Sequence, residues 1–236
     1  MNLCVIPARG GSKRIPRKNI KEFGGRPMIG WSIAAAQKSG CFDRIIVSTD
    51  DAEIAAVARE LGAETPFVRP DALSDDFTGT TPVVAHAVEE IIAQTGPVDA
   101  VCCLYATAPF VRSADLRDGL DKLKQDEQAD YVFTVTTYAF PPARALRMDT
   151  NGHVAMLNPE NETSRSQDLV EVVHDAGQFY WGRPDAWREH RPIFGPRSKA
   201  LVLPRHLVQD IDTPEDWERA EWMRRAMSAA AGESPA

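Results

Sequence analysis

A cluster of basic residues near the N-terminus is the group of side chains in this sequence best suited to chemistry. Seven Lys or Arg residues and one acid, Glu22, lie from Arg9 to Arg26, although the chain of 236 residues has a formal net charge of −7. Cations concentrated against the overall charge favour an anionic ligand. Gly10 and Gly11 lie in the same stretch, and a glycine backbone can approach a phosphate closely because it lacks a Cβ atom. The stretch therefore predicts a loop that wraps a triphosphate, rather than a solvated basic surface.

Two better-known phosphate motifs do not match this stretch. A Walker A loop requires Gly-x-x-x-x-Gly-Lys-Ser/Thr, with the lysine at the start of a helix. Here Ser12 precedes Lys13, and Pro16 follows three residues later, so no helix begins at the lysine. The dinucleotide pattern Gly-x-Gly-x-x-Gly is also absent from this loop.

Two aspartates near the C-terminus form a candidate metal site. Asp210 and Asp212 flank Ile211, and residues two apart in an extended segment face the same side. Mg²⁺ prefers oxygen ligands and retains several waters, so two carboxylates together with phosphate oxygens suit it. Asp212 is also a candidate N-cap for the helix that follows. Asp50 and Asp51 are weaker metal candidates, because an aspartate after a strand commonly caps the next helix.

The composition narrows the class of protein. A pI near 5.3 argues against general nucleic-acid binding. The cysteines at positions 4, 41, 102 and 103 have no metal-binding spacing, and we expect free thiols, buried where they lie in apolar segments. Neither a signal peptide nor an apolar stretch of about 20 residues is evident, so we expect a cytoplasmic protein that does not cross a membrane.

Alternating apolar and helical patterns predict the elements that position these residues. The pattern is typical of parallel βαβ units, so we expect an α/β fold with a mostly parallel central sheet flanked by helices. Strands are predicted at residues 3–6, 44–48, 65–68, 100–104, 131–135, 178–181 and 200–203; helices are predicted at 28–38, from about 52 to 61–62, and at 81–94, 114–124, 184–190 and about 212–227.

Residues 138–175 interrupt the pattern. They are rich in Pro, Asn and Arg, and segments 144–148 and 153–157 resemble the strands of a β-hairpin. We expect one domain over residues 1–236, with an inserted dimerisation subdomain at about 138–175 and a frayed tail at 229–236. An isolated hairpin is not stable alone, and two-fold pairing is the commonest assembly, so we expect a homodimer.

The motif Ala8-Arg9-Gly-Gly-Ser12-Lys13-Arg-Ile-Pro16-Arg-Lys18-Asn19 resembles the nucleotide-binding motif of the sugar-acid cytidylyltransferases, which make CMP-sialic acid and its relatives. The resemblance continues, in order, through Ser48-Thr49-Asp50, Arg69-Pro70, Ala106-Thr107-Ala108-Pro109-Phe110 and Asp210-Ile-Asp212-Thr-Pro-Glu-Asp216, and so covers nearly the whole chain. It implies a Rossmann-like nucleotidyltransferase in which the anomeric hydroxyl of a nine-carbon sugar acid attacks the α-phosphorus of CTP and pyrophosphate leaves.

The resemblance also implies roles for particular residues. It assigns Arg9, Lys13 and Lys18 to the triphosphate, whereas Arg14 and Arg17 are more readily explained as surface cations. The implied catalytic residues are Arg9, Lys13, Lys18 and Asp212; the implied CTP-binding residues are Ala8, Arg9, Gly11, Ser12, Lys13, Lys18, Asn19, Thr80 and Tyr105; the implied Mg²⁺ ligands are Asp210 and Asp212.

One departure from the pattern of the family bears on which sugar acid the chain would use. Sialic-acid-activating relatives carry a glutamine where this chain has Tyr105, and the surrounding segments resemble the pseudaminic acid branch. Arg144 and Arg165 are candidates for the sugar carboxylate, because a guanidinium matches two carboxylate oxygens. His174 is a candidate general base, although a histidine beside an aspartate is as often structural. The candidate sugar-binding residues are Arg144, Arg165, Gln167, His174, Gln178 and Tyr180.

Alternatives remain at this point. N-acetylneuraminic, legionaminic or 3-deoxy-octulosonic acid are rival substrates for the same reaction. A non-catalytic nucleotide- or RNA-binding module would use the basic loop without turnover and without need of the two aspartates. A structural assembly protein built on the hairpin would leave the charged loop unexplained.

Overall fold

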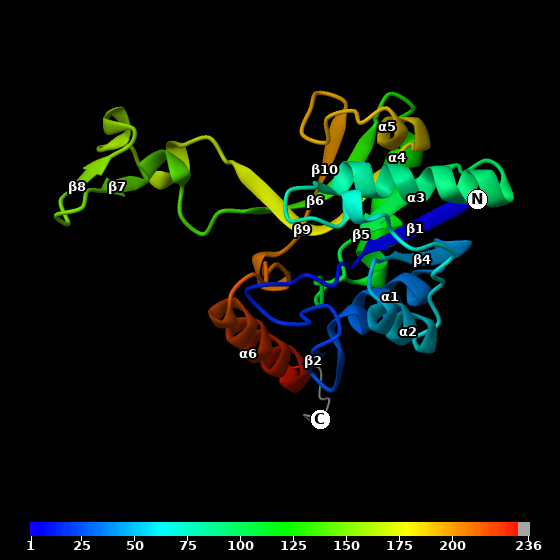
Figure 1. Cartoon of the computed structure of the whole chain (residues 1–236). Coiled ribbons are helices and arrows are strands. Elements are labelled where there is room, and N and C mark those ends of the chain that lie inside the picture. Colours follow the sequence, from blue (N-terminus) through cyan, green and yellow to red (C-terminus); the bar gives the residue numbers. More distant parts are fainter. Residues whose placement is uncertain (231–236) are drawn as a thin grey trace.

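Six strands form one central sheet, in the order β10-β6-β9-β5-β1-β4 (Figure 1). The structure is a computed structural model that describes residues 1–230. Only β9 runs antiparallel to its neighbours within this sheet, so the predicted mostly parallel sheet is confirmed. The strands are β1 (Asn2–Pro7), β4 (Arg44–Ser48), β5 (Ala100–Leu104), β6 (Tyr131–Thr137), β9 (Val173–Gly182) and β10 (Ser198–Val202).

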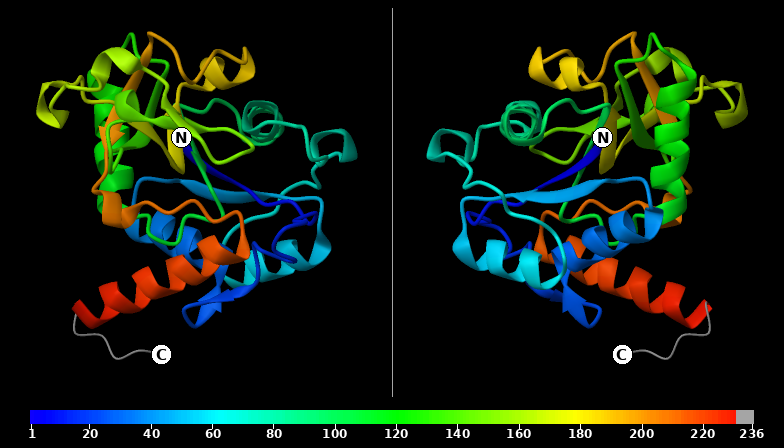
Figure 2. Two further views of the ribbon diagram at one scale, coloured as in Figure 1. Left: turned by 90° about the vertical axis from the view of Figure 1, so that its left-hand side faces the viewer. Right: turned by 90° about the vertical axis from the view of Figure 1, so that its right-hand side faces the viewer.

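Helices cover both faces of the sheet (Figure 2). Along β1, Cys4 and Ile6 pack into one core and Leu3 and Val5 pack into the other, and all four are fully buried. Burial on both faces explains why the strand is continuously apolar. The first core contains residues of α1 (Met28–Ser39), α2 (Ala52–Glu60) and α4 (Ser113–Gln125), and the second contains residues of α3 (Thr80–Thr95) and α5 (Pro184–Arg188).

A third, smaller core holds the basic loop in place. Ile15, in the middle of the charged stretch, packs with Phe23 and with Trp217 of helix α6 (Pro214–Ala230). The rings of Phe23 and Trp217 meet edge to face at 5.4 Å. Strands β2 (Glu22–Phe23) and β3 (Arg26–Pro27) close the loop with a small hairpin that the sequence analysis did not anticipate. This core fixes the loop although most of its side chains are charged.

The predicted strand at residues 65–68 is wrong. Only Glu64 forms a bridge, to Ile46 of β4, and the chain then leaves the sheet. Pro66 has no N–H to donate to a neighbouring strand, and Val68 is exposed. At the other end of the chain, residues 229 and 230 are helical, and the remainder of the predicted tail lies outside the described residues.

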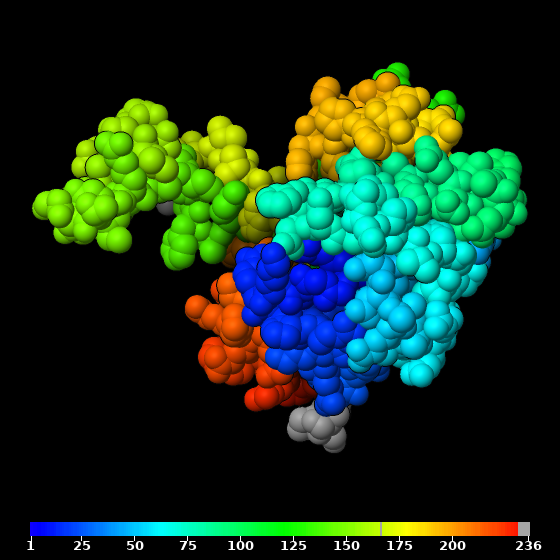
Figure 3. Space-filling view, viewed as in Figure 1, coloured from blue at the N-terminus to red at the C-terminus, as the bar shows by residue number. Residues whose placement is uncertain are grey.

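The predicted hairpin is present and projects from the sheet as an arm (Figures 1 and 3). Its strands are β7 (Leu146–Met148) and β8 (Val154–Met156), joined by a turn in which Gly152 has a φ of +86°. Leu146, Met148 and Val154 are exposed on this arm. The short 3-10 helices of the chain are Asp71–Leu73, Pro142–Arg144, Pro159–Asn161, Ser166–Asp168 and Arg205–Leu207.

Candidate active site

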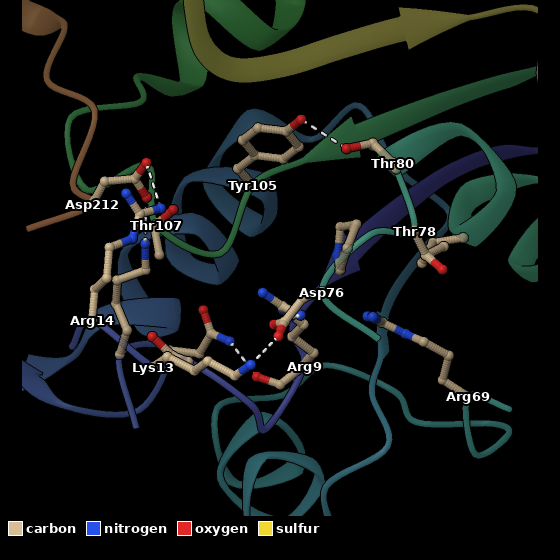
Figure 4. A pocket seen from close by; sticks show the side chains of 16 residues that line it. Arg9, Lys13, Arg14, Arg69, Asp76, Thr78, Thr80, Tyr105, Thr107 and Asp212 are labelled. Atoms are coloured by element: carbon tan, nitrogen blue, oxygen red, sulfur yellow. Dashed lines mark hydrogen bonds and ion pairs between the residues drawn. The ribbon is translucent and has the colours of Figure 1, made fainter. Parts of the chain in front are cut away.

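A cavity of about 510 Å³ lies at the carboxyl ends of β1 and β5, where open α/β sheets usually bind ligands (Figure 4). Pro7 ends β1, and Tyr105 follows β5 directly. The wall is completed by the basic loop, by a segment between α2 and α3, and by Asp212. The lining residues are Pro7, Arg9, Ser12, Lys13, Arg14, Lys18, Asn19, Arg69, Asp76, Thr78, Gly79, Thr80, Val83, Tyr105, Thr107 and Asp212.

Two cations of the basic loop converge on one carboxylate in this cavity. Arg9 Nη1 lies 2.6 Å from Asp76 Oδ1 and donates to the Asp75 carbonyl oxygen at 2.7 Å. Lys13 Nζ pairs with the other oxygen of Asp76. Lys13 and Arg9 hold the pKa of Asp76 below its ordinary value. Asp76 thus lies between two cations, in a position that an anionic ligand would also favour. The sequence analysis did not identify Asp76 as a site residue.

Two further loop cations, Arg14 and Lys18, pair with Asp212. Lys18 Nζ donates to the Ile211 carbonyl oxygen at 2.5 Å and lies 3.2 Å from Asp212 Oδ1. Arg14 Nη2 lies 2.9 Å from Asp212 Oδ2. Arg14 also lines the cavity, although its side chain is 64% exposed, and the sequence had favoured a surface role for it more than for Arg9 and Lys13. The Lys18 side chain is only 17% exposed, and its contacts join the basic loop to the segment before α6.

Asp212 does not cap helix α6, which corrects the alternative considered for it. Thr213 accepts a hydrogen bond from the Asp216 N–H at 3.2 Å, and the Thr213 N–H donates to Asp216 Oδ2 at 2.8 Å. This reciprocal pair is a capping box with Thr213 at the N-cap. Pro214 in the first turn fits the same arrangement. The Asp212 carboxylate is therefore available to the cavity.

The aspartate pair fits the chemistry of a magnesium ion. Ile211 is buried in the third core, with Asp210 and Asp212 on either side of it. Desolvation, followed by the Asp212 carboxylate, raises the pKa of Asp210 above its ordinary value, although its side chain is exposed. Within residues 1–230, no three His, Cys, Asp or Glu residues cluster as a metal site. Asp212 lines the cavity, whereas Asp210 does not. Carboxylate oxygens are the donors that magnesium prefers, and it completes its coordination with phosphate oxygens and water.

A buried arginine faces the same cavity. Arg69 is 4% exposed, and its Nε donates to Ser48 Oγ at 3.2 Å. Burial lowers its pKa to about 10, partly opposed by Asp50. A cation with so little water around it favours an anionic or acceptor group in the cavity. The Arg69-Pro70 dipeptide was part of the resemblance to the sugar-acid cytidylyltransferases, but the sequence analysis gave Arg69 no role in binding.

Gly10, Arg17, Asp50 and Asp51 do not line the cavity, and their contacts brace the basic loop. A Cβ atom on Gly10 would lie 2.6 Å from Asp51 Oδ2, and the Gly10 N–H donates to Asp50 Oδ1 at 3.1 Å. Asp51 caps α2, accepting from the N–H groups of residues 53 and 54, and pairs with Arg17 at 2.5 Å. The hydrogen bond from Arg17 is the main cause that lowers the pKa of Asp51 to about 2. Gly10 is thus required for close approach to Asp51, and Asp50 and Asp51 serve the fold.

The remaining residues that were predicted to bind the nucleotide divide into two groups. Ser12, Asn19, Thr80 and Tyr105 line the cavity, and Asn19 Nδ2 also donates to the Arg9 carbonyl oxygen at 2.9 Å. Ala8 is buried in the first core, and Gly11 is exposed without lining the cavity. The sequence analysis named Thr107 within a motif without giving it a role, and it did not name the cavity residues Pro7, Asp76, Thr78, Gly79 and Val83.

The structure does not bring the predicted sugar residues to this cavity. Arg144, Arg165 and Gln167 are exposed in the inserted segment, and Arg165 forms a two-point pair with Asp168 at 2.7 and 3.1 Å. His174 lies at the base of the arm, where its ring packs against Tyr138.

Gln178 and Tyr180 are also outside the cavity wall. Both are 3% exposed, whereas the sequence had made them candidates for sugar binding. Gln178 Nε2 donates to the Leu207 carbonyl oxygen at 2.5 Å, and Tyr180 belongs to the second core. The helices on both faces of the sheet bury both sides of this strand.

Comparisons with known proteins show the family of this chain. Residues 3–214 match the family model described as Cytidylyltransferase. A pseudaminic acid cytidylyltransferase of Campylobacter jejuni subsp. jejuni serotype O:2 is 49% identical over 220 residues, which cover 93% of this chain and 94% of that protein. A CMP-N,N'-diacetyllegionaminic acid synthase of Legionella pneumophila is 31% identical over 230 residues, covering 93% of this chain and 94% of the relative.

The fold is also found among solved structures. A CMP:2-keto-3-deoxy-manno-octonic acid synthetase complexed with CTP superposes with a TM-score of 0.70, covering 96% of this chain and 99% of that one, at 17% identity. At this identity the likeness supports the architecture alone. Within the described part of the chain, no helix is both long and apolar enough to cross a bilayer.

Proposed function

The chain belongs to the cytidylyltransferase family, and from this premise we propose that it transfers CMP from CTP to the anomeric hydroxyl of pseudaminic acid and releases pyrophosphate. The observation that carries the proposal is the group of four loop cations around one cavity that also contains Asp212. The 49% identical relative supports pseudaminic acid as the sugar. CMP-legionaminate or CMP-N-acetylneuraminate synthesis is the alternative within the same reaction class.

The cations are suited to the charge of the reaction. Transfer at phosphorus is catalysed mainly by positioning and by stabilising negative charge on the transferring and leaving groups. Arg9 and Lys13 hold one part of the triphosphate in place of Asp76, and Arg14 and Lys18 lie next to Asp212 in the same cavity. Buried Arg69 supplies a further fixed charge.

Asp212, with Asp210 beside it, would hold Mg²⁺. Both lie on a segment fixed by Ile211 in the third core, and Lys18 anchors this segment to the loop. When bound, the ion supplies positive charge to the phosphate oxygens. The protein's part is to keep the two carboxylates oriented and to leave Asp212 free of the helix cap.

The sugar end of the site is completed, we infer, by a second copy of the chain. Arg144 and Arg165 lie in the inserted segment, and neither lines the cavity of its own chain. The exposed apolar side chains of the arm favour burial in a homodimer, in which the segment at about 138–175 acts as the dimerisation subdomain of a single domain. Light scattering across a dilution series, with turnover measured in parallel, tests this; a fully active monomer would contradict it.

Substrate profiling tests the proposed reaction. The enzyme is mixed with CTP, Mg²⁺ and one sugar acid at a time, and pyrophosphate release is followed. We expect the highest kcat/KM with pseudaminic acid and lower values with legionaminic, N-acetylneuraminic and 3-deoxy-octulosonic acids. Tight RNA binding at moderate salt without turnover of any sugar would instead favour a non-catalytic nucleic-acid-binding module.

A further inference from the structure

A groove of about 360 Å³ lies between α1, α6 and the segment that follows β5, and it shares no lining residue with the active-site cavity. Its floor is apolar. Phe110 and Val111 are 3% and 8% exposed, and Met227 of α6 packs against the third core beside them. On the α1 side, Ala34 and Ala35 line the groove with small side chains. The groove is therefore an apolar surface on the outer side of the core that holds the basic loop.

The groove carries positive charge. Among the described residues, four cations and no acid line it, namely Arg26, Lys38, Arg112 and Arg224. The whole chain has 34 acids against 27 Lys and Arg residues, so the groove reverses the overall charge. Arg112 forms a two-point pair with Asp115, whereas Arg26 and Lys38 pair with no carboxylate in the described part of the chain. Unneutralised cations at a hollow of the surface favour an anionic partner.

Trp31 holds two of these cations in place. The guanidinium groups of Arg224 and Arg26 lie over its ring, at 3.7 and 4.3 Å from the ring centre. The ring is itself fixed, because its Nε1 donates to the Phe23 carbonyl oxygen at 2.9 Å. A guanidinium that lies on an aromatic face keeps its charge and its N–H donors. Cations fixed in this way lose less conformational entropy when an anion binds than mobile surface side chains would.

The cations are spread along the groove. Trp31 and Lys38 are seven residues apart in α1, so they lie on the same face of the helix and about 10 Å apart along its axis. Arg26 marks the end of the groove at Trp31, and Lys38 marks the other end. A ligand that neutralises both ends therefore carries acidic groups about 10 Å apart.

The floor between the two ends is unsuited to a highly polar ligand. Apart from the cations and Trp31, whose indole N–H is already used, Ser113 brings the one polar side chain to the lining. The sugar and base of a nucleotide would leave several donors and acceptors without partners on this floor. Apolar side chains of a peptide would instead bury apolar surface there.

We infer that this groove binds an extended acidic segment of a partner protein, with apolar side chains on the floor and acidic side chains paired with Arg26 and Lys38. In a polyproline II conformation, residues three apart lie on the same side of the peptide and about 9 Å apart. The spacing of the cations thus matches two acids separated by two apolar residues. The groove and its partner are independent of the reaction proposed for the active-site cavity.

A peptide of this design tests the inference. The probe is Glu-Asp-Leu-Leu-Asp-Glu with capped ends and one fluorescent label, and its binding to the full chain is followed by fluorescence anisotropy. Two reference peptides carry the same label: Gln-Asn-Leu-Leu-Asn-Gln lacks the charges, and Glu-Asp-Gly-Gly-Asp-Glu lacks the apolar side chains. We expect saturable binding of the probe with a Kd below about 1 mM, and at least tenfold weaker binding of each reference peptide.

Variants of the chain place the probe in the groove. Lys38→Gln and Arg26→Gln should each raise the Kd about twofold to fivefold, the usual effect of one exposed ion pair. Lys38→Glu should raise it further, because it adds repulsion. Lys38 is exposed in the last turn of α1, so its replacement retains the fold. Arg225→Gln is the matched control, because Arg225 is 69% exposed beside Arg224, pairs with Glu221 and does not line the groove.

Four results would overturn the inference. The first is a probe that does not bind saturably, and the second is equal binding of either reference peptide. The third is an equal loss of affinity in Arg225→Gln. The fourth is displacement of the probe by an equal concentration of pyrophosphate, which would show that the groove serves a small anion and not an acidic segment.

Discussion

Replacing Lys18 by methionine should reduce both stability and catalysis, because its ammonium group joins two parts of the site. Methionine retains most of the aliphatic stem and removes the charge. The change deletes a hydrogen bond to the Ile211 carbonyl oxygen and an ion pair with Asp212. Hydrogen bonds that involve a charged group contribute about 1.5–3 kcal/mol each. Asp212 is 40% exposed and still pairs with Arg14, so we expect a net loss near the lower limit, about 1–2 kcal/mol of unfolding free energy.

The catalytic loss should be larger. One fixed cation at a site of developing negative charge is worth about 3 kcal/mol, so kcat/KM should fall on the order of a hundredfold. Urea unfolding measures the unfolding free energy, and the rate of pyrophosphate release measures kcat/KM.

Lys13→Met is the matched control on the same loop. The Lys13 side chain is 79% exposed, so this substitution should change the unfolding free energy of the protein by less than about 0.5 kcal/mol. The value of kcat/KM should fall by a factor similar to that for Lys18→Met. Normal turnover in both variants would refute the assignment of this loop to the triphosphate. Equal destabilisation of the two variants would refute the anchoring role of Lys18.

Three further changes test neighbouring parts of the site. Asp212→Asn should raise the Mg²⁺ concentration needed for half-maximal turnover at least tenfold while α6 remains folded, because Thr213 and Asp216 form the cap; loss of helical circular dichroism would contradict this. Asp76→Asn should lower KM for CTP several-fold, because the triphosphate no longer competes with this carboxylate for Arg9 and Lys13; a higher KM would show that Asp76 assists binding. Asp51 has its pKa lowered from 3.8 to about 2, so its stabilising contribution is complete above about pH 4 and is lost as the pH falls toward 2; Asp51→Asn should flatten the loss of stability over this window, and an unchanged acid-unfolding curve would contradict the Arg17 pairing.

The sequence was sufficient to predict the elements whose residues carry their own periodic signal. The apolar strand predicted at residues 100–104 is confirmed, as are the helices beside it. A strand that is buried on both faces has a continuous apolar run, and this run was visible in the sequence. The strand predicted at 65–68 is wrong because Pro66 removes a donor and Val68 turns to solvent. Local composition did not show where the chain leaves the sheet.

The site was predictable as far as residue type indicates charge. Four cations of the basic loop and Asp212 line one cavity, because the third core around Ile15 folds the loop onto the segment before α6. Asp76 gave no comparable signal, since its position depends on contacts between segments far apart in the sequence. Gln178 and Tyr180 were named as sugar candidates, but the sequence of their strand does not reveal that both of its faces are covered.

A one-pot competition tests the central claim most directly. Equal amounts of pseudaminic, legionaminic, N-acetylneuraminic and 3-deoxy-octulosonic acids are incubated with limiting CTP, Mg²⁺ and the full chain, and the CMP-sugars are separated by mass. The account predicts CMP-pseudaminic acid as the dominant product, formed with one equivalent of pyrophosphate, and almost no product from Lys13→Met over the same period. CTP that remains intact with every sugar acid, or a dominant product from another sugar, would contradict it.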